Sequence, residues 1–173
     1  MGDPESSGLP VTVPEDVTLV SRPGMCISIG ALRAYRDGFL FHLVHSTLVS
    51  GAAAEGASLF FRGRTEHERR NLSRLVVRYA DGRMADSALM LARKGEHGLF
   101  LSIGGSFGSQ GCGWRRNHDR WLVAPLPVSG PVSFEIYLPG GPGLSGSASL
   151  DSSPIISAAA RAQVLWPPAY ELR

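Results

Sequence analysis

The chain is a succession of short segments in which apolar and polar residues alternate, each ended by Gly, Pro or Asp. The clearest is VSFEIYL at 132–138, where every second residue is apolar and a proline lies at each side. Successive side chains of an extended strand point to opposite faces, so a period of two indicates a strand with one buried face. We therefore expect a half-buried β-strand at 132–138.

The same alternation recurs along most of the chain. It predicts further strands at 17–21, 25–32, 39–48, 75–79, 84–91 and 99–103. The run at 39–48 is largely apolar on both faces, which is typical of a central strand covered on both sides. Asp81-Gly82 is a strong signal for a hairpin turn. Turn signals about every eight to twelve residues between short strands predict an all-β fold, an immunoglobulin-like antiparallel β-sandwich.

The end of the chain changes to helical spacing. Ser153 is a suitable N-cap, and Pro154 suits the first helical position. The apolar positions that follow share one helical face: Ile155, Ala159, Ala162 and Trp166. The sequence thus predicts one short C-terminal helix packed on the sandwich. The expected organisation is an extended N-terminal arm over 1–14, the β-sandwich over 15–150 and the helix over 151–168.

Composition narrows the class of protein. A chain of 173 residues fits one domain, and 18% charged with 43% hydrophobic residues argues against general disorder. The net charge of +2 is too small to indicate a nucleic-acid partner. The first residues lack a signal-peptide pattern, and no apolar run approaches the roughly 18 residues of a membrane helix. We therefore expect a cytoplasmic protein. Nothing in the sequence predicts that Cys26 and Cys112 form a disulfide.

Short motifs are shared with one group of proteins. They lie at 34–35, 38–39, 79–83, 104–105, 121–127, 130–131, 157–161 and 165–167. On these motifs, residues 10–168 resemble an uncharacterised family of actinobacterial β-sandwich proteins. The resemblance implies a sandwich of unknown function and supplies no catalytic residue. Here Ser106, Phe107 and Gln110 interrupt a run that is more purely glycine in the family.

The segment GGSFG at 104–108 matches the G-x-S-x-G pattern of serine hydrolases, with Ser106 as the nucleophile. That motif requires a helix directly after the serine, whereas the residues that follow predict a glycine-rich loop over 104–113. His118 and Asp119 are the nearest candidates to complete a triad, but neighbouring residues on a strand point to opposite faces. A hydrolase that uses Ser106 is therefore an alternative and not the leading interpretation.

Arginine and aromatic residues gather at 114–121. If this segment is a strand, one face carries Trp114, Arg116, His118 and Arg120, and the other carries Arg115, Asn117, Asp119 and Trp121. Arginine beside aromatic rings can stack on bases or grip carboxylates and phosphates. The predicted binding site is the first face together with Gly104 and Gly105. The alternative is a solvated edge strand whose Trp121 enters the core.

The histidines do not indicate a metal site. His42 and His45 are three residues apart on one predicted strand and so face opposite sides. His67, His97 and His118 have no Cys or carboxylate at ligand spacing. The sequence thus predicts no metal and no cofactor.

The resulting functional hypothesis is a non-catalytic module that binds a protein partner or associates with itself, with no membrane partner. The alternatives are the Ser106 hydrolase and a structural subunit that forms homo-oligomers.

Overall fold

The computed structural model describes residues 8–48, 73–90, 99–138 and 145–164. Its strands are β1 (Gly8–Leu9), β2 (Val11–Val13), β3 (Val17–Arg22), β4 (Met25–Tyr35), β5 (Gly38–Leu48), β6 (Arg74–Tyr79), β7 (Met84–Asp86), β8 (Phe100–Gly111), β9 (Trp114–Ala124), β10 (Pro131–Tyr137), β11 (Ser145–Asp151) and β12 (Gln163–Val164). The helices are α3 (Ser87–Met90) and α4 (Ser153–Arg161). The structure confirms the predicted all-β sandwich with a short C-terminal helix. Neither helix of the described residues is long and apolar enough to span a bilayer.

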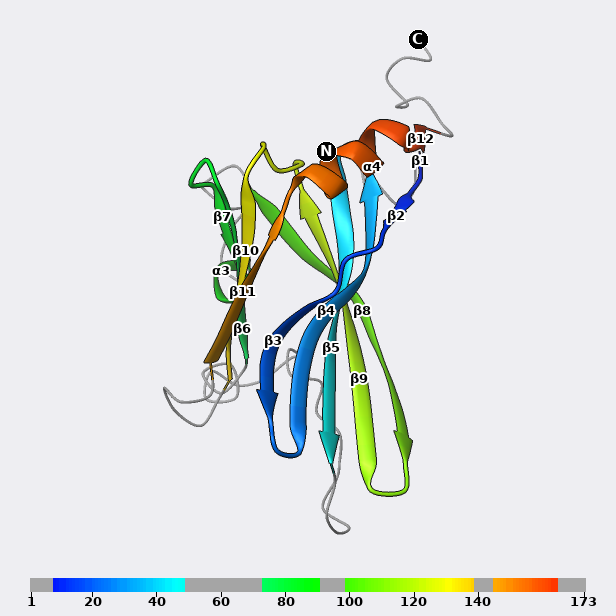
Figure 1. Cartoon of the computed structure of the whole chain (residues 1–173), viewed down its shortest axis with the longest axis vertical. Helices are drawn as coiled ribbons and strands as arrows, with labels where there is room; N and C mark the ends of the chain where they lie inside the picture. Colours follow the sequence, from blue (N-terminus) through cyan, green and yellow to red (C-terminus); the bar gives the residue numbers. More distant parts are fainter. Residues whose placement is uncertain (1–7, 49–72, 91–98, 139–144, 165–173) are drawn as a thin grey trace.

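Two antiparallel sheets make up the sandwich (Figure 1). The larger sheet has the order β2-β4-β5-β9-β8, and β3 pairs with β4 beyond the end of β2. The smaller sheet has the order β11-β10-β6-β7. A separate pair, β1 with β12, joins the two ends of the described chain, and residues 8–13 of the predicted arm form β1 and β2. The helix α4 crosses the upper end of the larger sheet, against β2, β4 and β5 (Figure 1).

The core lies between the two sheets. In β10 the side chains of Val132, Phe134 and Ile136 are fully buried, as the alternation predicts. The ring of Phe134 meets that of Phe41 on β5 edge-on, with the ring centroids 5.2 Å apart. Each such large apolar side chain stabilises the fold by about 1.5–3 kcal/mol when it leaves water. The face of the larger sheet that carries Phe41 is therefore its inner face, and the opposite face is its outer face.

The sheets approach each other closely where β11 lies against β3. A Cβ atom at Gly146 would collide with the main-chain carbonyl oxygen of Leu19 and with the side chain of Val20. Gly146 is therefore required by space, because only a residue without a side chain lets the two backbones come this close.

The helix begins one residue earlier than predicted and ends sooner. Ser152 is the N-cap and makes no side-chain capping bond. The carboxylate of Asp151 instead accepts hydrogen bonds from the main-chain N–H and the hydroxyl of Ser153. Of the predicted apolar stripe, Ile155 and Ala159 are buried. Ala162 is the C-cap, and Trp166 lies outside the described residues.

Two predicted segments differ in the structure. The prediction of a glycine-rich loop over 104–113 is wrong, because β8 continues to Gly111 and pairs with β9 on both sides of a register shift at Gly104. The return strand expected over 84–91 ends at Asp86. The Asp86 carboxylate accepts bonds from the main-chain N–H of Ala88 and from the Arg74 guanidinium. A carboxylate that bonds the backbone two residues ahead stabilises a turn, so the chain leaves the strand here.

Candidate binding face

The register of the larger sheet places the predicted binding residues on its outer face. Trp114, Arg116, His118 and Arg120 of β9 pair with Leu48, Ser46, Val44 and His42 of β5 and with Gly111, Ser109, Phe107 and Gly105 of β8. Residues paired directly across two strands point to the same side of a sheet. We call the group formed by His42, Phe107, Trp114, Arg116, His118 and Arg120 the outer patch. Trp121 points to the other side and is buried in the core, as expected for a strand.

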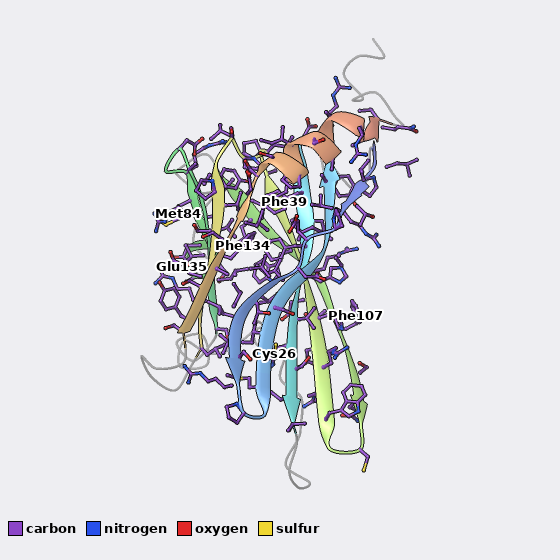
Figure 2. All side chains as sticks on the ribbon, in the orientation of Figure 1. Cys26, Phe39, Met84, Phe107, Phe134 and Glu135 are labelled. Carbon is purple, nitrogen blue, oxygen red and sulfur yellow. The ribbon has the colours of Figure 1, made fainter. Side chains whose placement is uncertain are left out.

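Three rings form the centre of the outer patch. The ring of Phe107 stacks on the imidazole of His118, with centroids 4.6 Å apart and planes 7° apart. His42 meets both rings edge-on, at 5.8 Å from Phe107 and 6.1 Å from His118. Phe107 remains 56% exposed. Figure 2 shows it projecting from β8 away from the core, whereas Phe39 and Phe134 lie between the sheets. The patch thus offers solvent an aromatic surface built from three strands.

The glycines of β8 let side chains of β9 lie across that strand. A Cβ at Gly104 would come within 2.7 Å of Nε of Arg120, whose guanidinium donates a hydrogen bond to the Gly104 carbonyl oxygen at 2.9 Å. A Cβ at Gly111 would likewise meet the indole of Trp114 at 2.5 Å. Gly105 has φ of +138°, a conformation that L side chains rarely adopt, next to a register shift. The sequence predicts Gly104 and Gly105 as part of a binding loop, whereas in the structure both residues belong to strand β8.

The charge of the outer patch is positive. Nε of Arg116 donates to the hydroxyl of Ser46 at 3.1 Å, which fixes that guanidinium over β5. Burial lowers the pKa of His42 below its usual 6.5, and the positive charges of His118, Arg33 and Arg120 lower it further. Burial and the positive charge of Arg116 also lower the pKa of His118, whereas the negative charge of Asp119 raises it. Both shifts favour the neutral form of the imidazole, whereas the guanidinium groups of the patch carry a permanent positive charge.

One acidic residue lies near the outer patch on the same face. The carboxylate of Asp16 occupies the space over Gly30, the partner of His42 on β4. It lies on the β4 side of His42, whereas Arg116 and Arg120 lie on the β9 side. Arg120, whose guanidinium lies across Gly104, places positive charge on the β8 side of the patch.

The inner face of the same hairpin holds a polar cluster. Ser106 donates a hydrogen bond to the carboxylate of Asp119, which is only 1% exposed. His45 faces the same side, and both of its ring nitrogens are buried without a hydrogen-bond partner. Burial lowers the pKa of His45, and the negative charge of Asp119 opposes the shift. The cluster is thus a buried, electrostatically coupled group beneath the outer patch.

The cluster does not have the geometry of a serine hydrolase. In a catalytic triad the serine bonds to an imidazole, which in turn bonds to the carboxylate. Here the Ser106 hydroxyl bonds directly to Asp119, and His118 lies on the opposite face, stacked on Phe107. Ser106 also lies inside β8 and not at a turn from a strand into a helix, which the hydrolase motif requires.

Sequence reasoning missed two residues of the outer patch. Phe107 was expected in a loop, and His42 was considered only as a metal ligand. The signal available for His42 was a polar side chain on an otherwise largely apolar strand, but no sequence pattern states which strands become neighbours. For Phe107 the available signal was the order Ser-Phe-Gly-Ser at 106–109. The glycine carries no side chain, so the apolar and polar positions do not form a recognisable alternation.

Metal-ligand and cysteine chemistry add little to this picture. Within the described ranges, no group of three His, Cys, Asp or Glu residues could hold a metal ion. Cys26 of β4 and Cys112 of the β8–β9 turn are both free thiols. His67 and His97 lie outside the described residues.

The outer patch therefore unites a stacked aromatic pair with guanidinium groups on an exposed strand face. Such a surface can contact apolar groups and hold carboxylates or phosphates at the same time. Comparison of the chain with protein-family models, with curated proteins and with solved structures gave no match.

Proposed function

We propose that this protein is a non-catalytic binding module that engages a protein partner through the outer patch. The observation that carries the proposal is the stacked pair of Phe107 and His118, which lies between Arg116 and Arg120 on one exposed face. Aromatic residues and arginine supply most of the binding energy at protein interfaces, because they combine large contact area with directed hydrogen bonds.

The charge and the ring geometry support a partner better than a reaction. Trp114 and Phe107 are 42% and 56% exposed, although large aromatic side chains gain most from burial. On this face the Ser46 hydroxyl accepts a hydrogen bond from a guanidinium, and the imidazole of His118 is stacked on Phe107, so the arrangement differs from that of an activated nucleophile. A partner that covers the rings and neutralises the arginines satisfies both groups at once.

Some finer expectations stay predictions beside this proposal. They are the immunoglobulin-like connectivity, the membership of an actinobacterial family and the cytoplasmic location. The second alternative is a structural subunit that associates into a homo-oligomer. A monomeric mass, measured by light scattering at high protein concentration, counts against it. A serine-reactive phosphonate that labels Ser106 would revive the hydrolase alternative.

The proposal is tested by partner capture with two matched double variants. The tagged wild-type protein and Trp114→Ala/Arg116→Ala are used to capture proteins from the cells that make it, and mass spectrometry identifies what is bound. The control is Arg78→Ala/Tyr137→Ala, which removes one exposed arginine and one exposed aromatic from the smaller sheet.

We expect a partner that wild type and control retain and that the outer-patch variant loses. A partner retained by both variants places the binding site elsewhere and contradicts the proposal. A partner lost by both variants also contradicts it, because the loss would then not depend on the outer patch.

A further inference from the structure

We infer that the partner binds as an extended acidic segment, which adds a strand to the outer edge of β8. This inference rests on the proposed function and names the chemistry and the conformation of its partner. Its side chains would then run beside the outer patch. Peptides bind other sheet edges in this way, with main-chain hydrogen bonds for affinity and side chains for specificity.

The first step of the argument is the position of β8. It is the last strand of the larger sheet, with β9 on one side, and in the described part of the chain no strand pairs with its other side. Its distal half, Phe107–Gly111, is exposed at every residue. An edge of this kind presents a row of N–H and C=O groups to a further strand.

The second step is that this edge lacks the features that normally block strand addition. Edges are protected by short length, charged side chains, proline or a covering element. The sequence GGSFGSQG at 104–111 contains neither a charge nor a proline. Other edges of the two sheets are protected. The edge strand β7 has only three residues before α3 begins, β2 has a proline on each side, and β11 lies against β3. The helix α3 and the strand β7 also contact β8, so the unprotected part of this edge is its exposed distal half, Phe107–Gly111.

The third step is charge complementarity. A strand added to β8 lies about 10 Å from β9, two strand spacings away. The guanidinium of Arg120 bridges part of this distance, because it lies across Gly104. Arg116 adds positive charge to the same face, with its guanidinium over β5, whereas the carboxylate of Asp119 is buried on the other face. Alternate acidic side chains of the added strand therefore approach the Arg120 guanidinium and face a positively charged surface.

The same charges argue against a second copy of this chain as the occupant. A second β8 edge would supply no acidic side chain to Arg120, because the segment 104–111 contains none. An acidic segment of a different protein supplies that charge on the same face as the exposed ring of Phe107.

The test uses three synthetic peptides and the folded protein. The first alternates Val and Glu, the second alternates Val and Lys, and the third repeats the first with every backbone nitrogen methylated, which removes the donors from both edges of the strand. Binding is measured by fluorescence anisotropy, and protection of the amides of 107–111 is measured by hydrogen exchange. Arg116→Glu is the charge-reversal variant, and Arg78→Glu on the smaller sheet is its control.

We expect the Val/Glu peptide to bind at least about tenfold more tightly than the Val/Lys peptide and to protect the amides of 107–111. Backbone methylation should abolish binding, because it removes main-chain donors. Arg116→Glu should reduce or invert the preference for the acidic peptide, whereas Arg78→Glu should leave it unchanged.

Three results would overturn the inference. If the methylated peptide binds as well as its parent while Arg116→Glu still weakens binding, strand addition is wrong although the outer patch remains a binding face. If no peptide binds at about 1 mM, the edge is not a docking site for extended segments. If the amides of 107–111 are protected without peptide in a dimer, the occupant is a second copy.

Discussion

The ring of Phe107 lies flat on the imidazole of His118, across the β8–β9 pair and in contact with solvent. The two residues are direct cross-strand partners, so the stack is built by the register of the hairpin. Stacking removes water from one face of the imidazole and disfavours its charged form. An aromatic side chain of β8 thereby influences the charge state of β9, and with it the charge that a partner meets.

The first prediction concerns this pair. Burial is the largest cause that lowers the pKa of His118, so Phe107→Ala should move that pKa upward, toward 6.5. An NMR titration of the imidazole signals measures the change. Trp114→Ala is the control, because it removes an aromatic from the same face at the far end of the hairpin. A pKa of His118 that stays in place in Phe107→Ala would show that the stack does not shield it.

The second prediction is the pH dependence of stability. The pKa values of His42, His45 and His118 are all lowered, chiefly by burial. At pH below about 6.5 the unfolded chain binds protons that the folded protein does not, so the free energy of unfolding should fall as the pH decreases. Urea unfolding at a series of pH values measures this slope.

The acidic groups act in a different window. Desolvation raises the pKa of Asp81, but hydrogen bonds from Arg83 outweigh it and lower the value, and hydrogen bonds from Ser153 lower the pKa of Asp151. Their contribution to stability is therefore lost only on stronger acidification, below pH 3.8. His45→Phe is the informative variant for the higher window, because it removes one buried imidazole and should flatten the slope near pH 6. Stability that increases between pH 6.5 and pH 5 would contradict the prediction.

The third prediction separates a structural Ser106 from a catalytic one. Ser106→Ala removes a donor from a buried carboxylate and should destabilise the fold by about 1–3 kcal/mol. Ser109→Ala, an exposed change on the same strand, should stay within about 0.5 kcal/mol. Thermal unfolding compares the two variants. Equal stabilities would mean that the bond between Ser106 and Asp119 contributes nothing to the fold.

The fourth prediction tests the role of glycine in β8. Gly104→Ala introduces a Cβ where Arg120 lies, and because that side chain is flexible it can move away at little cost to the fold. Partner or peptide binding should weaken by a factor of about ten, a loss of about 1.4 kcal/mol, with little change in Tm. Gly108→Ala displaces Asn117 on the inner face instead and should leave binding intact. Equal effects of the two changes on binding would count against a role for Arg120.

The fifth prediction concerns the contact between the sheets. At Gly146 the obstacle is the main chain of Leu19, which cannot rotate away as a side chain can. Gly146→Ala should therefore destabilise the protein by about 3 kcal/mol, as overpacking of a tight interior does. Ser147→Ala, the exposed neighbour, should have little effect in the same urea unfolding experiment. A stable Gly146→Ala protein would mean that β11 and β3 can separate without loss.

Sequence patterns predicted best those strands whose own side chains carry the alternation. Strand β10 shows this, because Val132, Phe134 and Ile136 are all buried and the residues between them are not. The distal half of β8 could not be found in this way, because its glycines leave no alternation to detect. Its strand conformation depends on pairing with β9, a partner that a local pattern does not contain.

The candidate site was predictable only where strand periodicity alone defines it. The shared face of Trp114, Arg116, His118 and Arg120 follows from strand periodicity alone. The stack with Phe107 and the edge-on contact with His42 depend on the order and register of three strands, which local sequence does not state. The end of β7 was missed because Asp86 holds the following turn through its own side chain, and this local bond outweighs the strand propensity of the residues beyond it.

The strands of the β8–β9 hairpin are buried along one half of their length and exposed along the other. Residues 121–124 are buried, whereas most of 104–118 is partly or fully exposed. The same two strands thus help to form the core at one end and present the outer patch at the other. Selection can therefore change, lengthen or shorten the far end while the near end keeps the chain folded, so a new partner can be acquired without a new fold.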